Sequence, residues 1–301
     1  MIVLNQQQEI IRNEAVNWFN NSSEQLFEIS GAAGTGKSVL LNAIINSLGI
    51  NNNEYLAMAF TGQAAIVMRT KGFPNARSIH SSLYEIVEKD IPDAKLAEKF
   101  GIKAKKKEFR LRRFLEPGIK LLVIDEAYMV PSNMAKDILS FGIKVLVCGD
   151  SHQLPPIGGN PAFLVSSKTH HLTQLMRQSL DNPIVYIANR AMRGEPIHNG
   201  AYGNDVLVIN DTDFLPQMIG FADCVLCGTN KTRETMNNYI RELSGFKGSI
   251  PGFGERLICR KNNWDFSIDG ISLANGLSGT IVSIPDPTKF DGKIFKIDFH
   301  F

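Results

Sequence analysis

Gly31-Ala32-Ala33-Gly34-Thr35-Gly36-Lys37-Ser38 is a complete G-x-x-x-x-G-K-[ST] sequence between a short apolar run and an amphipathic stretch. The apolar run, Leu26–Ile29, predicts a buried strand, and residues 39–48 carry apolar side chains at helical spacing. Glycines let the backbone N–H groups of such a turn point inward, and the helix start adds the positive end of its dipole. We therefore expect Gly31, Gly34, Thr35 and Gly36 to form a loop that binds phosphates.

Two side chains at the end of this loop suit a nucleotide bound with magnesium. Lys37 would place its charge between the outer phosphates, and Ser38 would offer its hydroxyl to a Mg²⁺ ion that bridges them. The alternative is a chance glycine turn before a core helix, but the flanking strand and helix favour nucleotide binding. The cofactors expected are therefore ATP and Mg²⁺.

Polar residues that would complete this site follow two further apolar runs. Asp125 and Glu126 come directly after residues 121–124. We expect Asp125 to hold the metal through its water shell and Glu126 to orient and deprotonate the attacking water. The alternative is that both carboxylates only cap a strand. Gln153 follows the run 144–148, which would bring it to the carboxyl edge of a parallel sheet, beside the γ-phosphate.

The composition is that of a globular protein of about two domains, with 44% hydrophobic and 21% charged residues over 301 positions. The net charge is only +2, but residues 95–113 carry nine basic and two acidic side chains. Phe100, Phe109 and Phe114 are interleaved with them. Cations and rings in one segment suit a strand of nucleic acid, although a charge run is most often a solvated face.

The four cysteines indicate a reducing compartment rather than a disulfide framework. Cys224 and Cys227 have C-x-x-C spacing but lie in an apolar run that predicts a strand, which favours buried thiols over a metal or redox pair. Neither a leader segment nor a run long enough to cross a bilayer is found in the sequence, so we expect a cytoplasmic location and no membrane partner.

Three polar residues outside the loop are further candidates. Gln8 lies near the start of a predicted helix over 4–20, where its amide suits the edge of an adenine ring or an exposed helix start equally. Thr61 follows the predicted strand 55–60, where its hydroxyl would hold a nucleic-acid phosphate or cap a helix. His80 is able to stack on a base, but the residues alone favour a structural histidine.

The second part of the chain has weaker patterns. Gly158, Gly159 and Pro161 mark a change of domain. Beyond them we expect a helix over 182–192 and a buried strand over 222–227. Short apolar segments after residue 254, divided by glycine and asparagine, predict the beginning of a small antiparallel β-barrel.

Taken together, these motifs resemble those of the superfamily 1 DNA helicases of the RecD and Dda type. The resemblance covers nearly the whole chain, and three motifs, at 31–38, 125–127 and 149–156, are specific for helicases in this order. The other matching motifs are Leu4 with Gln8, Thr61–Ala65, Ile79–Ser81, Leu172–Arg177 and Thr229–Asn230.

The resemblance implies an α/β fold with a RecA-like P-loop domain built on a parallel sheet, over residues 1–160. It also implies an inserted basic pin-type subdomain at about 83–118, a partial second RecA-like domain at 161–250 and the start of an SH3-like β-barrel at 251–301. The implied activity is ATP-dependent 5′ to 3′ movement on single-stranded DNA at a fork. By position, Gln8 would read adenine, and Gln153 and Arg177 would touch the γ-phosphate. The implied DNA contacts are Thr61, His80, Lys105, Lys106, Lys107, Phe109 and Asn230.

The sequence departs from this family in one respect. The family's T-x-H-K-x-Q-G and V-x-x-T-R motifs are not found in it. We therefore expect the amino-terminal portion of a helicase, truncated or split, whose second RecA-like domain is completed by a downstream segment or a second chain. The alternative is a non-motor module that binds ATP and single-stranded DNA as a partner or regulator.

Overall fold

The computed structural model describes residues 3–90, 105–174, 182–213, 216–248, 251–260, 263–268, 271–273, 276–283 and 296–299. The chain divides into two compact units. Unit 1 comprises Met1–Met176 and Lys261–Gly276, and unit 2 comprises Arg177–Arg260 and Leu277–Phe301.

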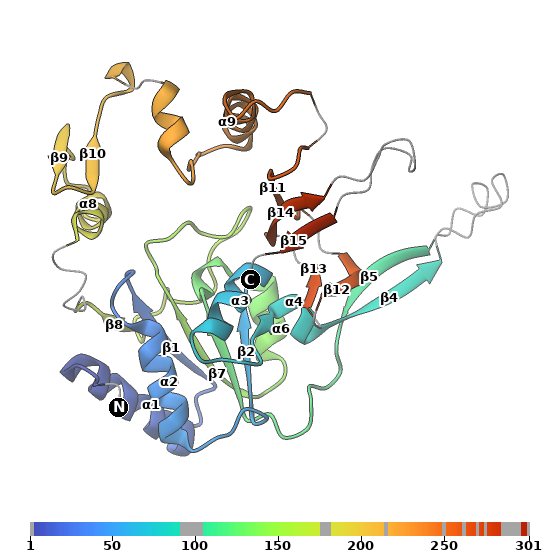
Figure 1. Cartoon of the computed structure of the whole chain (residues 1–301). Coiled ribbons are helices and arrows are strands. Elements are labelled where there is room, and N and C mark those ends of the chain that lie inside the picture. The colour runs from blue at the N-terminus through green and yellow to red at the C-terminus, as the bar shows by residue number, and fades with distance from the viewer. Residues whose placement is uncertain are drawn as a thin grey trace. The chain divides into compact units, whose positions relative to one another are not determined.

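Unit 1 is built on a six-stranded parallel sheet (Figure 1). Its strand order is β3-β2-β6-β7-β1-β8. Its strands are β1 (Leu26–Gly31), β2 (Tyr55–Ala59), β3 (Arg77–Ser78), β6 (Leu121–Asp125), β7 (Lys144–Gly149) and β8 (His170–Leu172). The predicted parallel sheet is confirmed. Parallel strands are covered on both faces, which is why residues 55–59 and 121–124 are apolar in succession rather than alternating with polar residues.

Two apolar cores lie on the two faces of this sheet, because alternate residues of each strand point to opposite sides. Ala57 and Val123 belong to the first core, and Leu122 and Ile124 belong to the second. The first core includes residues of α1 (Gln6–Asn21), α2 (Lys37–Leu48) and α3 (Gly62–Thr70). The second includes residues of α4 (Ile79–Leu83), the short 3-10 helix η1 (Ala127–Met129) and α6 (Ser132–Leu139).

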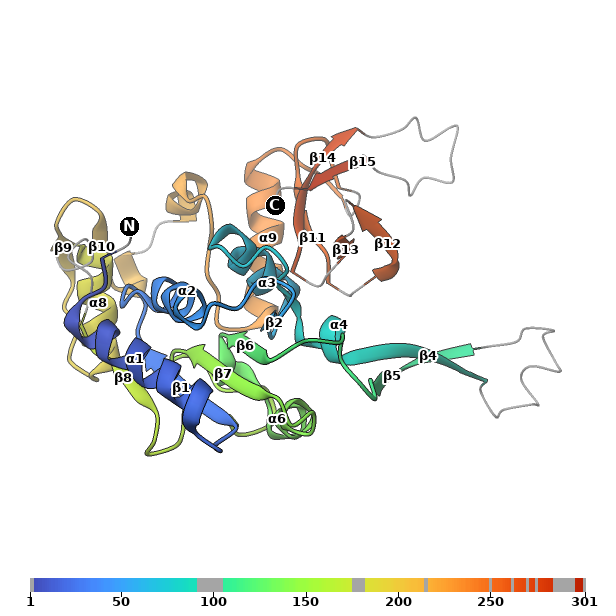
Figure 2. The same cartoon turned by 90° about the horizontal axis from the view of Figure 1, so that it is seen from below.

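A two-stranded antiparallel ribbon, β4 (Tyr84–Asp90) with β5 (Lys105–Leu111), projects away from the sheet of unit 1 (Figure 2). Part of the basic segment therefore forms β5, with Phe109 opposite Ile86. Residues 91–104, which include Phe100, lie outside the described residues. A second ribbon of unit 1 pairs β12 (Asn263–Ile268) with β13 (Ile271–Leu273).

Unit 2 contains shorter elements. Its helices are α8 (Pro183–Met192), η2 (Asp211–Asp213), η3 (Pro216–Phe221) and α9 (Asn230–Leu243). Its strands are β9 (Gly200–Tyr202), β10 (Val206–Val208), β11 (Arg256–Ile258), β14 (Ser278–Ser283) and β15 (Lys296–Phe299). The helix expected over 182–192 is confirmed as α8, capped by Asn182. Antiparallel pairing after residue 254 is confirmed by the sheet β11-β14-β15, while its closure into a barrel stays a prediction.

The buried strand expected over 222–227 is wrong. This segment is irregular, Leu226 is 92% exposed, Cys224 is exposed and Cys227 is half-buried. An apolar run becomes a buried strand only where neighbouring strands pair with its backbone. No such neighbour is found among the described residues of unit 2.

Within the described ranges, no helix has the length and apolar character needed to span a membrane.

Candidate nucleotide site

The phosphate loop connects β1 to α2, and its backbone shape requires glycine at three positions. Gly34 and Gly36 have φ angles of 82° and 79°, which side chains rarely adopt. A Cβ atom at Gly31 would lie 2.6 Å from Thr35 Oγ1 and 2.9 Å from Leu172 Cβ. Thr35 is buried, and its hydroxyl donates to the carbonyl oxygen of Ala32 over 2.8 Å. The sequence therefore closes the loop into the compact cradle that phosphate binding needs.

Gln8 is fully buried beneath this loop. Its Nε2 donates to the carbonyl oxygen of Thr35 over 3.1 Å, and its Oε1 accepts from Asn5 N over 3.0 Å in the capping box of α1. The alternative that Gln8 is an exposed residue at the start of a helix is thus wrong, because its amide is buried and hydrogen-bonded to the loop. Its contact with adenine stays a prediction.

Sequence reasoning gave no separate role to Gln7. Its Nε2 donates to His171 O over 2.7 Å, and its Oε1 accepts from Thr173 N over 3.0 Å. These bonds tie the start of α1 to the end of β8, beside the loop. The partners are 164 and 166 residues away along the chain, so no local pattern indicates them.

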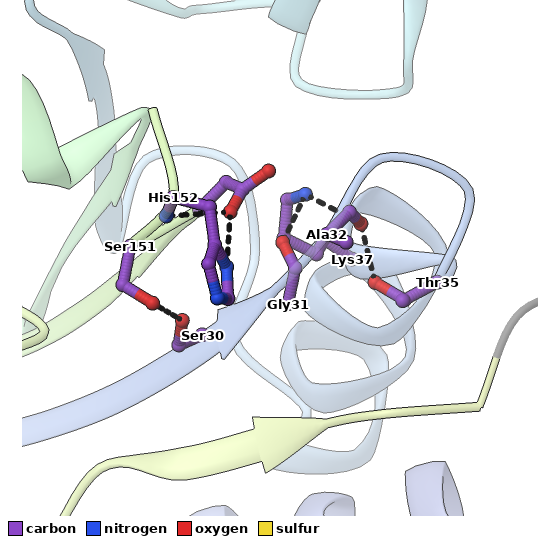
Figure 3. Close-up of polar contacts among 8 residues, drawn as sticks. Ser30, Gly31, Ala32, Thr35, Lys37, Ser151 and His152 are labelled. Atoms are coloured by element: carbon purple, nitrogen blue, oxygen red, sulfur yellow. Dashed lines mark hydrogen bonds and ion pairs between the residues drawn. The ribbon is translucent and has the colours of Figure 1, made fainter. Parts of the chain in front are cut away.

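Lys37 lies over the loop (Figure 3). Its Nζ donates to the carbonyl oxygens of Gly31 and Ala32, over 2.7 and 3.1 Å. Backbone carbonyls are weaker partners for an ammonium group than phosphate oxygens, which carry full charges. Lys37 is therefore held at the loop by bonds that an anion is able to replace. Ser38 is half-buried at the second position of α2.

Glu126 is the most perturbed residue of the site. Its φ angle is 53°, a left-handed conformation rarely taken by a residue with a side chain. Burial raises the pKa of its carboxyl group, and the neighbouring Asp125 raises it further, while Lys37 and a hydrogen bond from Gln153 oppose the shift. Its Oε2 is buried without a hydrogen-bond partner among the described residues. Backbone strain, an unsatisfied oxygen and a raised pKa are the features expected of a functional carboxylate.

Asp125 ends β6 and is buried. Its Oδ1 accepts from Glu126 N over 3.0 Å. The structure therefore brings together the loop, both carboxylates and Gln153 at the carboxyl ends of β1, β6 and β7, as the sequence predicted. Arg177 lies outside the described residues.

Four further polar residues of this edge had no individual role in the sequence prediction. Ser30 Oγ donates to Ser151 Oγ over 3.0 Å, which joins β1 to the segment after β7 (Figure 3). The buried Asp150 accepts from His152 N over 2.9 Å. The contact between Ser30 and Ser151 depends on β1 lying beside β7, and that adjacency is visible only once the strand order is known.

The candidate DNA contacts lie in several places. Thr61 caps α3 by accepting from Ala64 N over 3.1 Å, so the capping role is confirmed. Its contact with a DNA phosphate stays a prediction. Lys105, Lys106 and Lys107 form the beginning of β5, and Asn230 is the exposed first residue of α9 in unit 2.

His80 belongs to an aromatic cluster at the base of the β4–β5 ribbon. Its ring lies 5.5 Å from Tyr84 and 5.7 Å from Phe109, measured between centroids. Burial lowers the pKa of His80, so its ring is neutral at pH 7. Tyr84 donates to Asp137 Oδ2 over 2.6 Å, which anchors the cluster to α6. Phe109 remains 50% exposed, so this side of the cluster is open to solvent, and its contact with a DNA base stays a prediction.

The model of the AAA domain family matches residues 3–206. The ATP-dependent RecD2 DNA helicase of Deinococcus radiodurans is 30% identical over 184 residues, which cover 58% of this chain and 22% of that protein. The ATP-dependent DNA helicase PIF1 of Saccharomyces cerevisiae is 31% identical over 220 residues, which cover 64% of this chain and 23% of that protein. The chain thus spans less than a quarter of the length of these curated relatives.

Solved structures with a similar fold include Bacteroides Pif1 bound to ssDNA, with a TM-score of 0.53 and 17% identity over 99% of this chain and 72% of that chain. Pif1 helicase from Candida albicans gives a TM-score of 0.51 and 21% identity over 94% of this chain and 69% of that chain. At these identities the likeness shows a shared fold.

Proposed function

Since the chain belongs to the AAA domain family and carries a P-loop domain of the RecD and Pif1 helicase type, we propose that it hydrolyses ATP to drive movement on single-stranded DNA. The observation that supports this most directly is Glu126. Its backbone is strained, and its Oε2 is buried without a hydrogen-bond partner among the described residues, which is the arrangement expected of a general base and not of a strand cap.

In this proposal the chain's own groups divide the work of phosphoryl transfer. The loop N–H groups and Lys37 bind the outer phosphates, and Lys37 exchanges the carbonyls of Gly31 and Ala32 for phosphate oxygens. Ser38 and Asp125 would hold Mg²⁺, which neutralises charge on the phosphates when bound. Glu126 takes the proton of the attacking water, and its raised pKa makes it a stronger base than an exposed glutamate.

Glu126→Gln tests this assignment. The amide keeps the size of the side chain but is unable to accept the proton, so we expect nucleotide affinity within about threefold of wild type and a rate of hydrolysis at least about 100-fold lower. Affinity is measured with a fluorescent ATP analogue and hydrolysis by phosphate release. If the glutamine variant hydrolyses ATP at the wild-type rate, Glu126 is not the base.

The nucleic-acid partner that we propose is single-stranded DNA at a fork, crossed in the 5′ to 3′ direction, in the cytoplasm. The similarity to helicases and the half-exposed Phe109 support this partner. Exposed apolar residues of unit 2, such as Leu207 and Leu226, favour a second chain or further segment packing there. A non-motor module would bind both ligands without coupling them. Stimulation of ATP hydrolysis by single-stranded DNA distinguishes the two, because only a motor requires it.

A further inference from the structure

We propose that Glu28, a buried residue of β1, is a positioning residue that fixes the backbone of Glu126 through Leu164 and Gly149. This inference rests on the proposed function, in which Glu126 is the general base. All of these residues belong to unit 1. Glu28 lies in the strand before the phosphate loop, and no motif includes it.

The carboxylate of Glu28 accepts hydrogen bonds from the loop between β7 and β8. Glu28 is only 6% exposed, and its Oε1 accepts a hydrogen bond from Leu164 N over 2.7 Å. Its Oε2 accepts from Thr169 Oγ1 over 3.4 Å. Among the described residues, no lysine, arginine or histidine forms an ion pair with this carboxylate. Removing a carboxylate from water costs free energy. For Glu28 the hydrogen bond from the backbone N–H of Leu164 offsets part of that cost.

Leu164 has an unfavourable backbone conformation. Its φ angle is 64°. Among the described residues other than glycine, only Leu164 and Glu126 have a left-handed backbone. A branched side chain crowds the backbone there, so the conformation persists only where other contacts impose it. The hydrogen bond to Glu28 is such a contact, and the side chain of Leu164 is itself buried in the second core.

The side chain of Leu164 and the backbone that follows Glu126 both lie beside Gly149 at the end of β7. A Cβ atom at Gly149 would lie 2.9 Å from Leu164 Cδ1 and 3.0 Å from Ala127 N. The side chain and this peptide nitrogen therefore converge on the space that Gly149 leaves open at the end of β7. Ala127 N belongs to the peptide bond made by Glu126, so its position sets the direction in which Glu126 leaves β6.

A second bond secures the same loop to the segment after Glu126. Ala162 N donates to Val130 O over 3.2 Å, and Pro131 and Pro161 form an isolated β-bridge. The loop is thus fixed on one side to β1 by Glu28 and on the other to the segment that begins at Glu126. If the bond to Glu28 is removed, Leu164 is free to leave its left-handed conformation, and the packing around Gly149, beside which Ala127 N also lies, loosens.

Glu28→Ala tests the proposal. A displacement of the base by a fraction of an ångström slows hydrolysis, so we expect a kcat about tenfold lower. Nucleotide affinity should stay within about twofold, because Lys37 bonds to Gly31 and Ala32 and not to Glu28. Hydrogen exchange should become faster at the amides of Leu164 and of residues 126–128. Glu28→Gln retains an oxygen that accepts from Leu164 N and should restore kcat to within about threefold of wild type.

Gln25→Ala is the matched control. Gln25 precedes β1, and its amide donates to Leu139 O and Ile143 O over 2.8 and 2.9 Å, away from Glu126. We expect this variant to lower the melting temperature and leave kcat unchanged. If Glu28→Ala does not fold, Gly149→Ala disturbs the same contact from β7 and should lower kcat with affinity retained.

The outcomes separate this inference from the proposed function. A wild-type protein without ATP hydrolysis would contradict the proposed function. An active wild type whose Glu28→Ala variant keeps the wild-type kcat, or loses affinity and kcat in equal measure, would overturn the positioning role alone. Unchanged exchange at Leu164 would overturn it as well, because the amide would then not depend on Glu28.

Discussion

At the scale of single residues, the bonds of Lys37 allow a direct prediction. Lys37→Ala removes the cation of the loop, and charged hydrogen bonds of this kind are worth enough to weaken nucleotide affinity by about 10- to 100-fold. Lys168→Ala is the control, because it removes the same charge from an exposed pair with Glu24. Titration with a fluorescent ATP analogue gives both affinities. Equal affinity in the Lys37 variant and in wild type would mean that the loop does not bind phosphate.

Glu126 also predicts a pH dependence of stability. Its folded-state pKa is raised above its ordinary value of 4.5, so between the two pKa values the folded protein binds more protons than the unfolded chain. Stability therefore falls as the pH rises through this window, and Glu126 destabilises the protein at every pH where it is ionised in the folded state. We expect Glu126→Gln to melt at a higher temperature than wild type at pH 7, and the difference to shrink as the pH is lowered through the folded-state pKa.

Thermal melting of both proteins from pH 7 to pH 5 measures this difference. Glu116→Gln serves as the control, since Glu116 is exposed and paired with Arg77. A glutamine variant of Glu126 that melts below wild type at pH 7 would contradict the prediction. The raised pKa and the proposed catalytic role have the same cause, because a carboxylate held away from water is both costly to ionise and ready to take a proton.

At the scale of elements, the β4–β5 ribbon predicts where salt-dependent DNA binding resides. Neutralising Lys105–Lys107 to alanine should lower the slope of log affinity against log salt by about 0.7 for each DNA phosphate that the variant no longer neutralises. The control neutralises three lysines elsewhere in unit 1, Lys120, Lys136 and Lys168, which gives the same net charge. Binding of labelled single-stranded DNA at several salt concentrations measures the slopes. The same slope in both triple variants would make the basic segment a solvated face.

The elements that the sequence predicted correctly are those whose neighbours are fixed by the fold. Residues 55–59 and 121–124 are apolar throughout because they belong to inner strands covered on both faces. Residues 222–227 have a similar composition, yet Leu226 is exposed. An apolar run indicates that burial is favourable, but it does not indicate that a partner strand is present. Sequence reasoning was therefore correct for the parallel sheet and for α8 of unit 2, and wrong for residues 222–227, where no partner strand is found among the described residues.

At the scale of the whole molecule, the candidate site was predictable where motifs are local and unpredictable where contacts are distant. The loop and the two carboxylates each follow their own strand, so their meeting at one edge of the sheet follows from parallel order. The bond between Glu28 and Leu164 joins residues 136 positions apart. Neither residue type suggests the other, and the left-handed backbone of Leu164 has no signature in the sequence.

The division of the chain into two units leads to the last prediction. The described nucleotide site lies in unit 1, whereas Asn230 lies at the exposed start of α9 in unit 2, after the capping residue Thr229. Backbone N–H groups at a helix start are suited to phosphate oxygens, and the Asn230 amide adds a donor there. A motor must contact DNA with both units, so that nucleotide binding in one is able to alter the grip of the other. A non-motor module has no such requirement.

We therefore expect Asn230→Ala to raise the concentration of single-stranded DNA needed for half-maximal stimulation of ATP hydrolysis by about tenfold, which corresponds to removing one hydrogen bond to a charged group at the lower end of its range. The rate without DNA should not change, because unit 1 retains its loop and Glu126. Asn238→Ala provides the control, since Asn238 is an exposed asparagine of the same helix, two turns further from its start. ATP hydrolysis is measured across a DNA titration for the three proteins. Equal half-maximal concentrations would place the DNA contacts in unit 1 alone, and a reduced rate without DNA would show that α9 supports the nucleotide site instead.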